Sequence, residues 1–344
     1  MKCFYRINRN SYALLMGIVL AMITSFQVRA LELPGPLVQP DWLEKHLDQV
    51  LILDVRADVK SFSKRSKSKS PVNPCGAGIK GKAPKVVAGH IPGATLVRWS
   101  LLTAQKKVGG QKLDGWLPKQ EDFQQLMQRS GLNRDSLVVI TGKGKTPIQT
   151  AMAARLYLTL RFFGHDQAAL LDGGTAAWIH SGRDVKFGSS RAKRGNFEAA
   201  PGKEKWIATL SQVESSIQAG DRQLLDNRKP AAYLGLSRHL KEVADKWKGH
   251  IPTAKNLPLS YLANSVGPSA KVFDTETIQK VASSNGIDVT KPTTVYCNSG
   301  VMASLGWFVL HEVLGNQDVL LYNGSAQEWV AAKKPLKTFE ADSP

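Results

Sequence analysis

Four short sequence landmarks occur in the same order in both halves of this 344-residue chain. In the first half they are 51–56 (LILDVR), 88–97 (AGHIPGATLV), 136–141 (SLVVIT) and 170–178 (LLDGGTAAW). In the second half they are 224–228 (LLDNR), 248–258 (KGHIPTAKNLP), 293–297 (TTVYC) and 321–329 (LYNGSAQEW). An ordered internal repeat of this length predicts two copies of one domain that pack as similar units.

Helical patterns separate the short apolar strands in both halves. They cover residues 120–131, 146–164, 275–286 and 300–315. Strands that alternate with amphipathic helices predict an α/β fold with parallel sheets and helices on both faces. A polar, basic stretch rich in Gly and Ser at 186–203 is typical of a linker. We therefore expect domain one at 31–185 (copy one below) and domain two at 204–344 (copy two).

Cys297 lies between a strand and a helix in the second repeat. Thr294, Val295 and Tyr296 are typical of a buried strand, and apolar residues recur at helical spacing after the cysteine. A thiol at such a turn can face the amides of the first helical turn, which stabilise a thiolate. This stretch alone leaves two interpretations open, a reactive nucleophile or a buried apolar cysteine at a strand end.

The first thirty residues have the plan of a secretory signal peptide. Three basic residues precede an apolar run at 12–23, and Val28 and Ala30 supply the small residues of a cleavage site. We expect cleavage after Ala30, with Leu31 beginning a periplasmic or secreted protein. An uncleaved anchor is the alternative, although the run is short for a transmembrane helix.

Residues 60–85 form a basic insertion in the first repeat. The insertion contains eight Lys or Arg residues, no acid, many Ser, Pro and Gly residues, and Cys75. This composition predicts a solvated segment. The chain has a formal charge of +18, but the insertion lacks interleaved aromatic residues and a recognition motif, so nucleic acid is not an expected partner. Attraction of small anions or of an anionic membrane or envelope surface fits better.

Together the landmarks resemble the rhodanese family, specifically its tandem-domain sulfurtransferases of the thiosulfate and 3-mercaptopyruvate types. The D-x-R strand end, the G-H-I-P-x-A turn, the strand ending in cysteine and the segment before tryptophan each match, over nearly all of the chain after residue 30. The resemblance implies two doubly wound α/β domains without a metal or cofactor. It also implies that copy one is non-catalytic, because Thr141 occupies the place of Cys297.

In this family the loop that begins at the cysteine surrounds the sulfur with backbone amides. The corresponding residues here are Asn298, Ser299, Gly300, Val301 and Met302. The resemblance implies that Cys297 takes sulfur from a small anionic donor as a persulfide. Cyanide or a thiol would then accept that sulfur, in two covalent steps.

Asp226, Arg228 and His250 are expected to support the site. Each has a counterpart in copy one, which lacks the cysteine, so we expect them mainly to hold the strand end and the G-H-I-P turn. Acid–base chemistry is the alternative for His250.

The loop and the D-x-R strand end bear on the identity of the donor. Thiosulfate-type enzymes place Arg and Lys after the cysteine, whereas CNSGVM resembles the CGSGVT loop of mercaptopyruvate-type enzymes. Ser299 can donate to the donor or cap the following helix, and both roles stay open. Relatives also carry a second arginine where this chain has Ala232. Candidate substitutes for that cation are Lys229, Arg238, His239 and Lys248.

Three other functions are alternatives to sulfur transfer. A cysteine phosphatase or arsenate reductase needs C-x5-R, and this chain has Ala303 at the arginine position. A dithiol redox protein needs C-x-x-C, and position 300 is glycine. The remaining alternative is a sulfur carrier or binding module that holds persulfide on Cys297 for a protein partner.

Overall fold

The computed structural model describes residue 1 and residues 31–65, 87–236, 248–264 and 266–339. Residues Met1–Glu32 separate from the rest as a unit of their own, so the following concerns Leu33–Pro344. The expected signal peptide and Cys75 lie outside the described residues. Across the described ranges, no helix combines the length and the apolar character that a membrane crossing requires.

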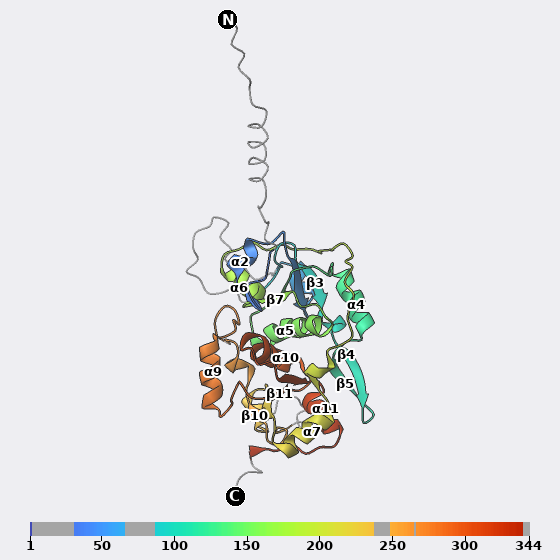
Figure 1. Cartoon of the computed structure of the whole chain (residues 1–344), viewed down its shortest axis with the longest axis vertical. Coiled ribbons are helices and arrows are strands. Elements are labelled where there is room, and N and C mark those ends of the chain that lie inside the picture. The colour runs from blue at the N-terminus through green and yellow to red at the C-terminus, as the bar shows by residue number, and fades with distance from the viewer. Residues whose placement is uncertain (2–30, 66–86, 237–247, 265, 340–344) are drawn as a thin grey trace. The chain divides into compact units, whose positions relative to one another are not determined.

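Each copy contains a five-stranded parallel sheet, and the two sheets have the same strand order (Figure 1). In copy one the order is β1 (Leu37–Val38), β7 (Ala168–Leu171), β6 (Val138–Gly142), β2 (Leu51–Arg56) and β3 (Thr95–Arg98). In copy two it is β8 (Ile207–Ala208), β12 (Val319–Tyr322), β11 (Thr293–Tyr296), β9 (Gln223–Asp226) and β10 (Lys255–Asn256). The identical order confirms the predicted duplication and the parallel α/β fold.

Helices cover both faces of each sheet, because the buried strands are apolar on both sides. The outer faces pack against α2 (Pro40–Glu44), α3 (Lys60–Ser63) and α6 (Gly174–His180) in copy one, and α7 (Leu210–Ala219), α8 (Pro230–Tyr233) and α11 (Ser325–Ala331) in copy two. The inner faces pack against α4 (Gln120–Arg129), α5 (Pro147–Phe162), α9 (Thr275–Ser284) and α10 (Val301–Trp307). Short 3-10 helices occur at Trp99–Leu101, Glu204–Trp206 and Leu259–Tyr261.

The inner faces of the two copies share one hydrophobic core. Figure 1 shows α5 and α10 in contact between the sheets. The ring of Tyr157 on α5 meets the ring of Phe308 edge-on, with centroids 4.8 Å apart. Phe308 begins a π-helical continuation of α10, Phe308–Val313. Nearby, Arg161 Nη1 lies 3.2 Å from Glu312 Oε2.

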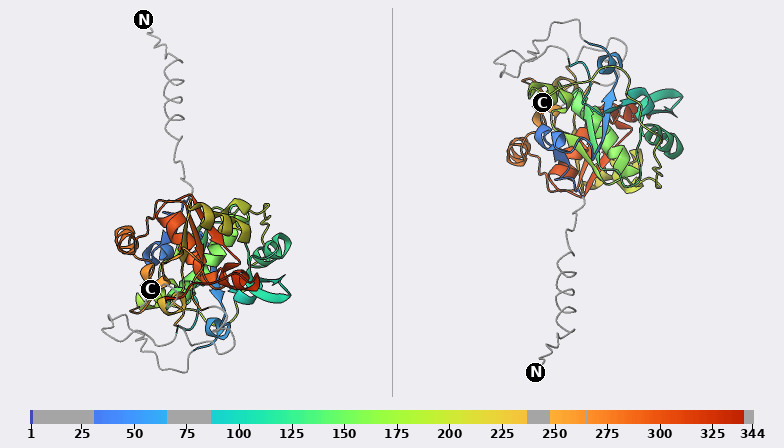
Figure 2. Two further views of the ribbon diagram at one scale, coloured as in Figure 1. Left: turned by 90° about the horizontal axis from the view of Figure 1, so that it is seen from below. Right: turned by 90° about the horizontal axis from the view of Figure 1, so that it is seen from above.

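An antiparallel hairpin extends from copy one onto copy two. It consists of β4 (Ala104–Val108) and β5 (Gln111–Trp116). The hairpin, drawn in teal, lies beside the red α11 in Figures 1 and 2, and Gln327 Nε2 of α11 donates to Asp114 O at 2.6 Å. Elsewhere, Ala270 N of copy two donates to Gly144 O of copy one at 2.7 Å. Backbone groups of copy one therefore accept hydrogen bonds from copy two at two separate places.

Two segments that we expected to be polar contribute to the core. Residues 60–63, predicted to begin the basic insertion, form α3, because Phe62 is buried and stacks on His90 with centroids 3.9 Å apart. The insertion therefore starts later than expected, and 66–86 lie outside the described residues. The stretch 186–203 runs along copy one, with Phe197 buried against Phe123.

The shared core predicts a single unfolding transition for both copies. Replacing Phe308 by Ala removes a fully buried ring that contacts both halves. We expect a loss of about 3–5 kcal/mol in the free energy of unfolding, measured by denaturant titration. Leu101→Ala is the control, because Leu101 is 52% exposed and its loss should cost little. Two separate transitions, only one of them shifted by Phe308→Ala, would contradict the shared core.

Candidate active site

Cys297 directly follows β11, the middle strand of the second sheet. Cys297 is 1% exposed. Within the part of the chain that the structure describes, it is a free cysteine that forms no disulfide. Its amide donates to Ser325 Oγ at 3.2 Å, and its carbonyl accepts from Ala326 N at 3.0 Å. The start of α11 therefore fixes the backbone on both sides of the thiol.

The residues after Cys297 form a tight loop that leads into α10. Asn298 O accepts a hydrogen bond from Gln327 N at 3.1 Å. Gly300 is the N-cap of α10, with φ of 80°, and a Cβ there would lie 2.9 Å from Asn323 O. The loop needs glycine at this position for both reasons. Ser299 makes no capping bond to α10. Of the two roles left open for its hydroxyl, capping the helix is therefore not seen, and donation to the donor stays a prediction.

Val301 and Met302 are half-buried and form the first turn of α10. The amides of a first helical turn have no partner inside the helix and carry its positive end. Of the five residues implied by the sequence, three thus form the loop after Cys297 and two form the first turn of α10. The geometry gives the sulfur a setting that suits an anion.

Arg155 of α5 brings a positive charge from copy one to this loop. Its guanidinium is buried, and Nη2 donates to Asn323 Oδ1 and to Gly115 O, both at 2.6 Å. Nη1 lies 3.4 Å from Ser304 Oγ, which itself donates to Gly300 O. Burial lowers the pKa of Arg155 to about 10, while the charge of Cys297 acts in the opposite direction. Arg155 therefore remains a cation at neutral pH.

The hairpin of copy one also touches the loop directly. A Cβ at Gly115, whose φ is 83°, would overlap Ser299 O. This close approach requires glycine on the hairpin side. The loop is thus enclosed by both copies, although the cysteine comes from copy two.

Asp226 and Arg228 form a buried ion pair at the end of β9. Arg228 Nε lies 3.0 Å from Asp226 Oδ1, and Nη2 donates to Asp226 Oδ2 and to Gly249 O at 2.5 Å. Burial alone would lower the pKa of Arg228, but the carboxylate of Asp226 outweighs it and the pKa is raised. The charge of Cys297 also raises this pKa, so Arg228 lies in the electrostatic neighbourhood of the sulfur.

The pair repeats in copy one without a cysteine. Arg56 Nε lies 2.6 Å from Asp54 Oδ1, and its Nη2 donates to Gly89 O at 3.2 Å. Because the same bonds form beside Thr141, they account for the D-x-R motif as a support of the strand end and of the G-H-I-P turn.

His250 contacts Tyr233, the last residue of α8. Its Nδ1 lies 3.0 Å from Tyr233 O, and its ring stacks on Tyr233 with centroids 3.9 Å apart. His90 makes the equivalent pair of contacts with Phe62. This geometry explains both histidines without acid–base chemistry.

The position of the second family arginine carries no cation. Ala232 is half-buried in α8. Of the candidate substitutes, Lys229 and Lys248 are exposed, and Arg238 and His239 lie outside the described residues. Sequence reasoning missed Arg155 and Gly115, since both belong to copy one and neither lies in a family landmark. The signal for Arg155 was a basic residue within the apolar run AMAARLYLTL.

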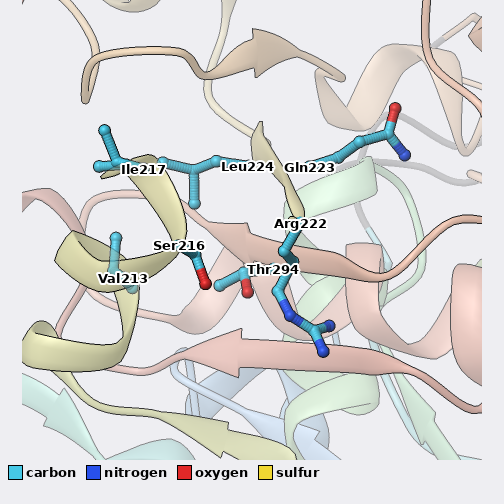
Figure 3. Close-up of a pocket in the computed structure, with 7 residues that line it drawn as sticks. All are labelled: Val213, Ser216, Ile217, Arg222, Gln223, Leu224 and Thr294. Atoms are coloured by element: carbon cyan, nitrogen blue, oxygen red, sulfur yellow. The ribbon is translucent and has the colours of Figure 1, made fainter. Parts of the chain in front are cut away.

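A small surface hollow lies at the opposite end of the second sheet (Figure 3). Its lining includes Arg222 and Gln223 at the start of β9 and Thr294 near the start of β11. Arg222 is held there by Asp318, with Nη2 2.5 Å from Oδ1. The hollow is therefore separate from Cys297, which follows the other end of β11.

Comparisons with known proteins agree with this geometry. The model of the rhodanese-like domain matches residues 39–181 and 209–332, more than half of the chain. The sulfur carrier protein TtuD of Thermus thermophilus is 28% identical over 310 residues, which cover 86% of this chain and 94% of that protein. A protein of Saccharopolyspora erythraea, provisionally named thiosulfate sulfurtransferase, is 28% identical over 85% of this chain and 92% of its own length.

A solved structure extends the likeness to the arrangement of both domains. SseA from Escherichia coli, of the 3-mercaptopyruvate type, superposes with a TM-score of 0.64 and 25% identity, over 85% of this chain and 98% of its own. The regions that the family model matches contain β11, Cys297 and the first-copy strand β6, which includes Thr141. The chain therefore belongs to the rhodanese-like family, with two copies of the domain, and groups with the sulfurtransferase enzymes of that family.

Proposed function

We propose that this protein is an exported sulfurtransferase that carries sulfane sulfur as a persulfide on Cys297. The observation that supports this most is the placement of a buried cysteine between β11 and the start of α10, beside Asn323 and Ser304, which both accept hydrogen bonds from Arg155 of copy one. Copy one, with the same fold and Thr141 at that place, has no such nucleophile. We infer that copy one completes the site without doing the chemistry.

The first step is attack by the Cys297 thiolate on the outer sulfur of the donor. With thiosulfate, the new S–S bond forms on Cys297, the S–S bond of the donor breaks, and sulfite leaves with the electron pair. With 3-mercaptopyruvate, the new S–S bond forms on Cys297, the C–S bond of the donor breaks, and the leaving enolate takes up the proton of the donor's thiol to become pyruvate. Either way Cys297 carries a persulfide anion.

In the second step an acceptor removes the outer sulfur. Cyanide forms thiocyanate, and a thiolate forms its own persulfide, while Cys297 leaves as the thiolate. The amides of Val301 and Met302, in the first turn of α10, would stabilise both anionic states of Cys297. No proton has to be stored on a side chain between the steps when cyanide is the acceptor.

The loop favours 3-mercaptopyruvate over thiosulfate as the donor. Thiosulfate is a dianion and needs cations that face it, but the loop residues Asn298 and Ser299 are neutral. The guanidinium of Arg155 is directed at protein groups. A monoanionic donor requires less compensation, and Ser299 can donate its hydroxyl to it.

Replacing Cys297 by Ser should abolish sulfur transfer, because a hydroxyl does not form the persulfide. The purified mature protein is mixed with 3-mercaptopyruvate or thiosulfate, and intact mass is measured for one added sulfur atom. Turnover with cyanide is measured in parallel. Thr141→Ser is the matched control, because it changes the corresponding residue of copy one and should leave transfer intact. Transfer that persists in Cys297→Ser would rule out the proposed function.

A sulfur carrier is the second candidate, and the similarity to TtuD favours it. A carrier would load one sulfur on Cys297 and release it slowly to cyanide or small thiols. Loading without repeated turnover in the same experiment would therefore assign the carrier role, and repeated turnover would assign the enzyme.

The hairpin contact predicts that a change in copy one alters the chemistry of copy two. Gly115→Ala should slow transfer because its methyl group would overlap Ser299 O. Gly110→Ala is the matched control: its φ of 81° gives a similar backbone strain, of about 1–2 kcal/mol, but its Cβ meets nothing within 4 Å. Equal turnover in the two variants would show that the hairpin does not shape the loop.

Export is proposed from the signal peptide pattern of residues 1–30. We expect the mature protein to begin at Leu31. Expression in a Gram-negative host, fractionation, and N-terminal sequencing of the periplasmic protein test this. Recovery of a membrane-bound chain that still begins with the basic N-terminus would indicate an uncleaved anchor instead.

A further inference from the structure

Arg155 is a buried cation whose hydrogen-bond acceptors are all neutral groups. The acceptors given for it in the described structure are Gly115 O, Asn323 Oδ1 and Ser304 Oγ. Its Nε is buried without a partner. A buried charge is costly unless an opposite charge compensates it. Burial lowers the pKa of Arg155 and a negative charge on Cys297 would raise it, while Nη1 lies 3.4 Å from where a Cβ of Gly300, in the loop after Cys297, would stand.

The internal repeat provides a comparison for this residue. Gly164 and Gly315 follow the equivalent helices, and counting back the same distance from each places Gly306 opposite Arg155. The correspondence agrees with the packing, since Tyr157 and Phe308, two positions further on, contact each other. At Gly306 there is no side chain, and the space of a Cβ is taken by the side chain of Asn227. At this helix position copy two therefore carries no arginine.

A second difference between the copies occurs at the acceptor of Arg155. Asn323 occupies the place that Asp172 has in copy one. An aspartate at 323 would accept the same hydrogen bond but would neutralise Arg155. The chain thus combines cysteine, arginine and a neutral amide at one site, and threonine, glycine and aspartate at the corresponding positions of the other.

We propose that Arg155 is a positioning residue of the sulfur-transfer site: from copy one, it supplies the fixed positive charge that stabilises the anionic sulfur of Cys297. The inference rests on the proposed function. Arg155 acts through Ser304 and Asn323, behind the loop, so it supports the thiolate and the persulfide without binding the donor. The positive charge that supports the sulfur of copy two is therefore contributed by the copy that does no chemistry.

The decisive variant is Asn323→Asp, which retains an acceptor for Arg155 and adds a compensating negative charge. The rate of persulfide loading on Cys297 by 3-mercaptopyruvate is measured in a single turnover, by quench and intact mass. We expect loading about tenfold slower or more, with an unfolding temperature at or above that of the wild type. Loading of Asn323→Asp at the wild-type rate would overturn the role proposed for Arg155. Asp172→Asn, the mirror change in copy one, is the matched control and should load at the wild-type rate.

Variants of Arg155 test the charge directly. Arg155→Met should slow loading about 100-fold, the scale of losing one fixed electrostatic group in a buried site, and Arg155→Lys should recover part of the rate. Arg161→Met is the control, since Arg161 lies on the same helix and also bonds across the copies, to Glu312. It should lower stability while loading continues.

The outcomes separate this inference from the proposed function. If wild-type Cys297 takes up no sulfur from either donor, the proposed function fails. If the wild type loads and folded Asn323→Asp and Arg155→Lys load equally fast, the role of Arg155 alone is wrong. If Arg155→Met does not fold, the comparison of Asn323→Asp with Asp172→Asn still decides.

Discussion

The packing of α5 against α10 determines most of the other features of this structure. The two helices carry the apolar residues that join both sheets into one core, with Tyr157 and Phe308 in contact at its centre. Because α10 begins at the loop after Cys297, the same packing places a helix of copy one behind that loop. Arg155 reaches the loop only because its helix lies there. Stability and the electrostatics of the site thus depend on one interface.

The ordered repeat was sufficient to predict the fold and the place of the nucleophile. The landmarks mark the carboxyl ends of parallel strands, and those ends lie together at one edge of each sheet. The sequence alone therefore predicts that D-x-R and Cys297 lie at that edge. The sequence resemblance also indicated the loop 297–302. These inferences depend on residues that are close along the chain or repeated within it.

The remainder depends on contacts that no local pattern encodes. Arg155 is separated from Cys297 by 142 positions, and its role follows from how the two copies pack. Ser299 does not cap α10 because Gly300, with its positive φ, is the N-cap residue instead. The start of the basic insertion was placed too early because Phe62, among many polar residues, packs against His90. In each case one tertiary contact outweighed the local composition.

The reciprocal cover of the two loops limits how far the copy without the cysteine is free to change. Ala270 N binds Gly144 O, Thr150 Oγ1 donates to Ala270 O, and a side chain at Gly173 would meet Ser269. The loop after Thr141 therefore serves as a joint between the copies although it has no nucleophile. After a duplication, such a loop can lose its nucleophile by a single substitution. Its backbone conformation cannot change in the same way, because that would break contacts to the copy that retains the nucleophile.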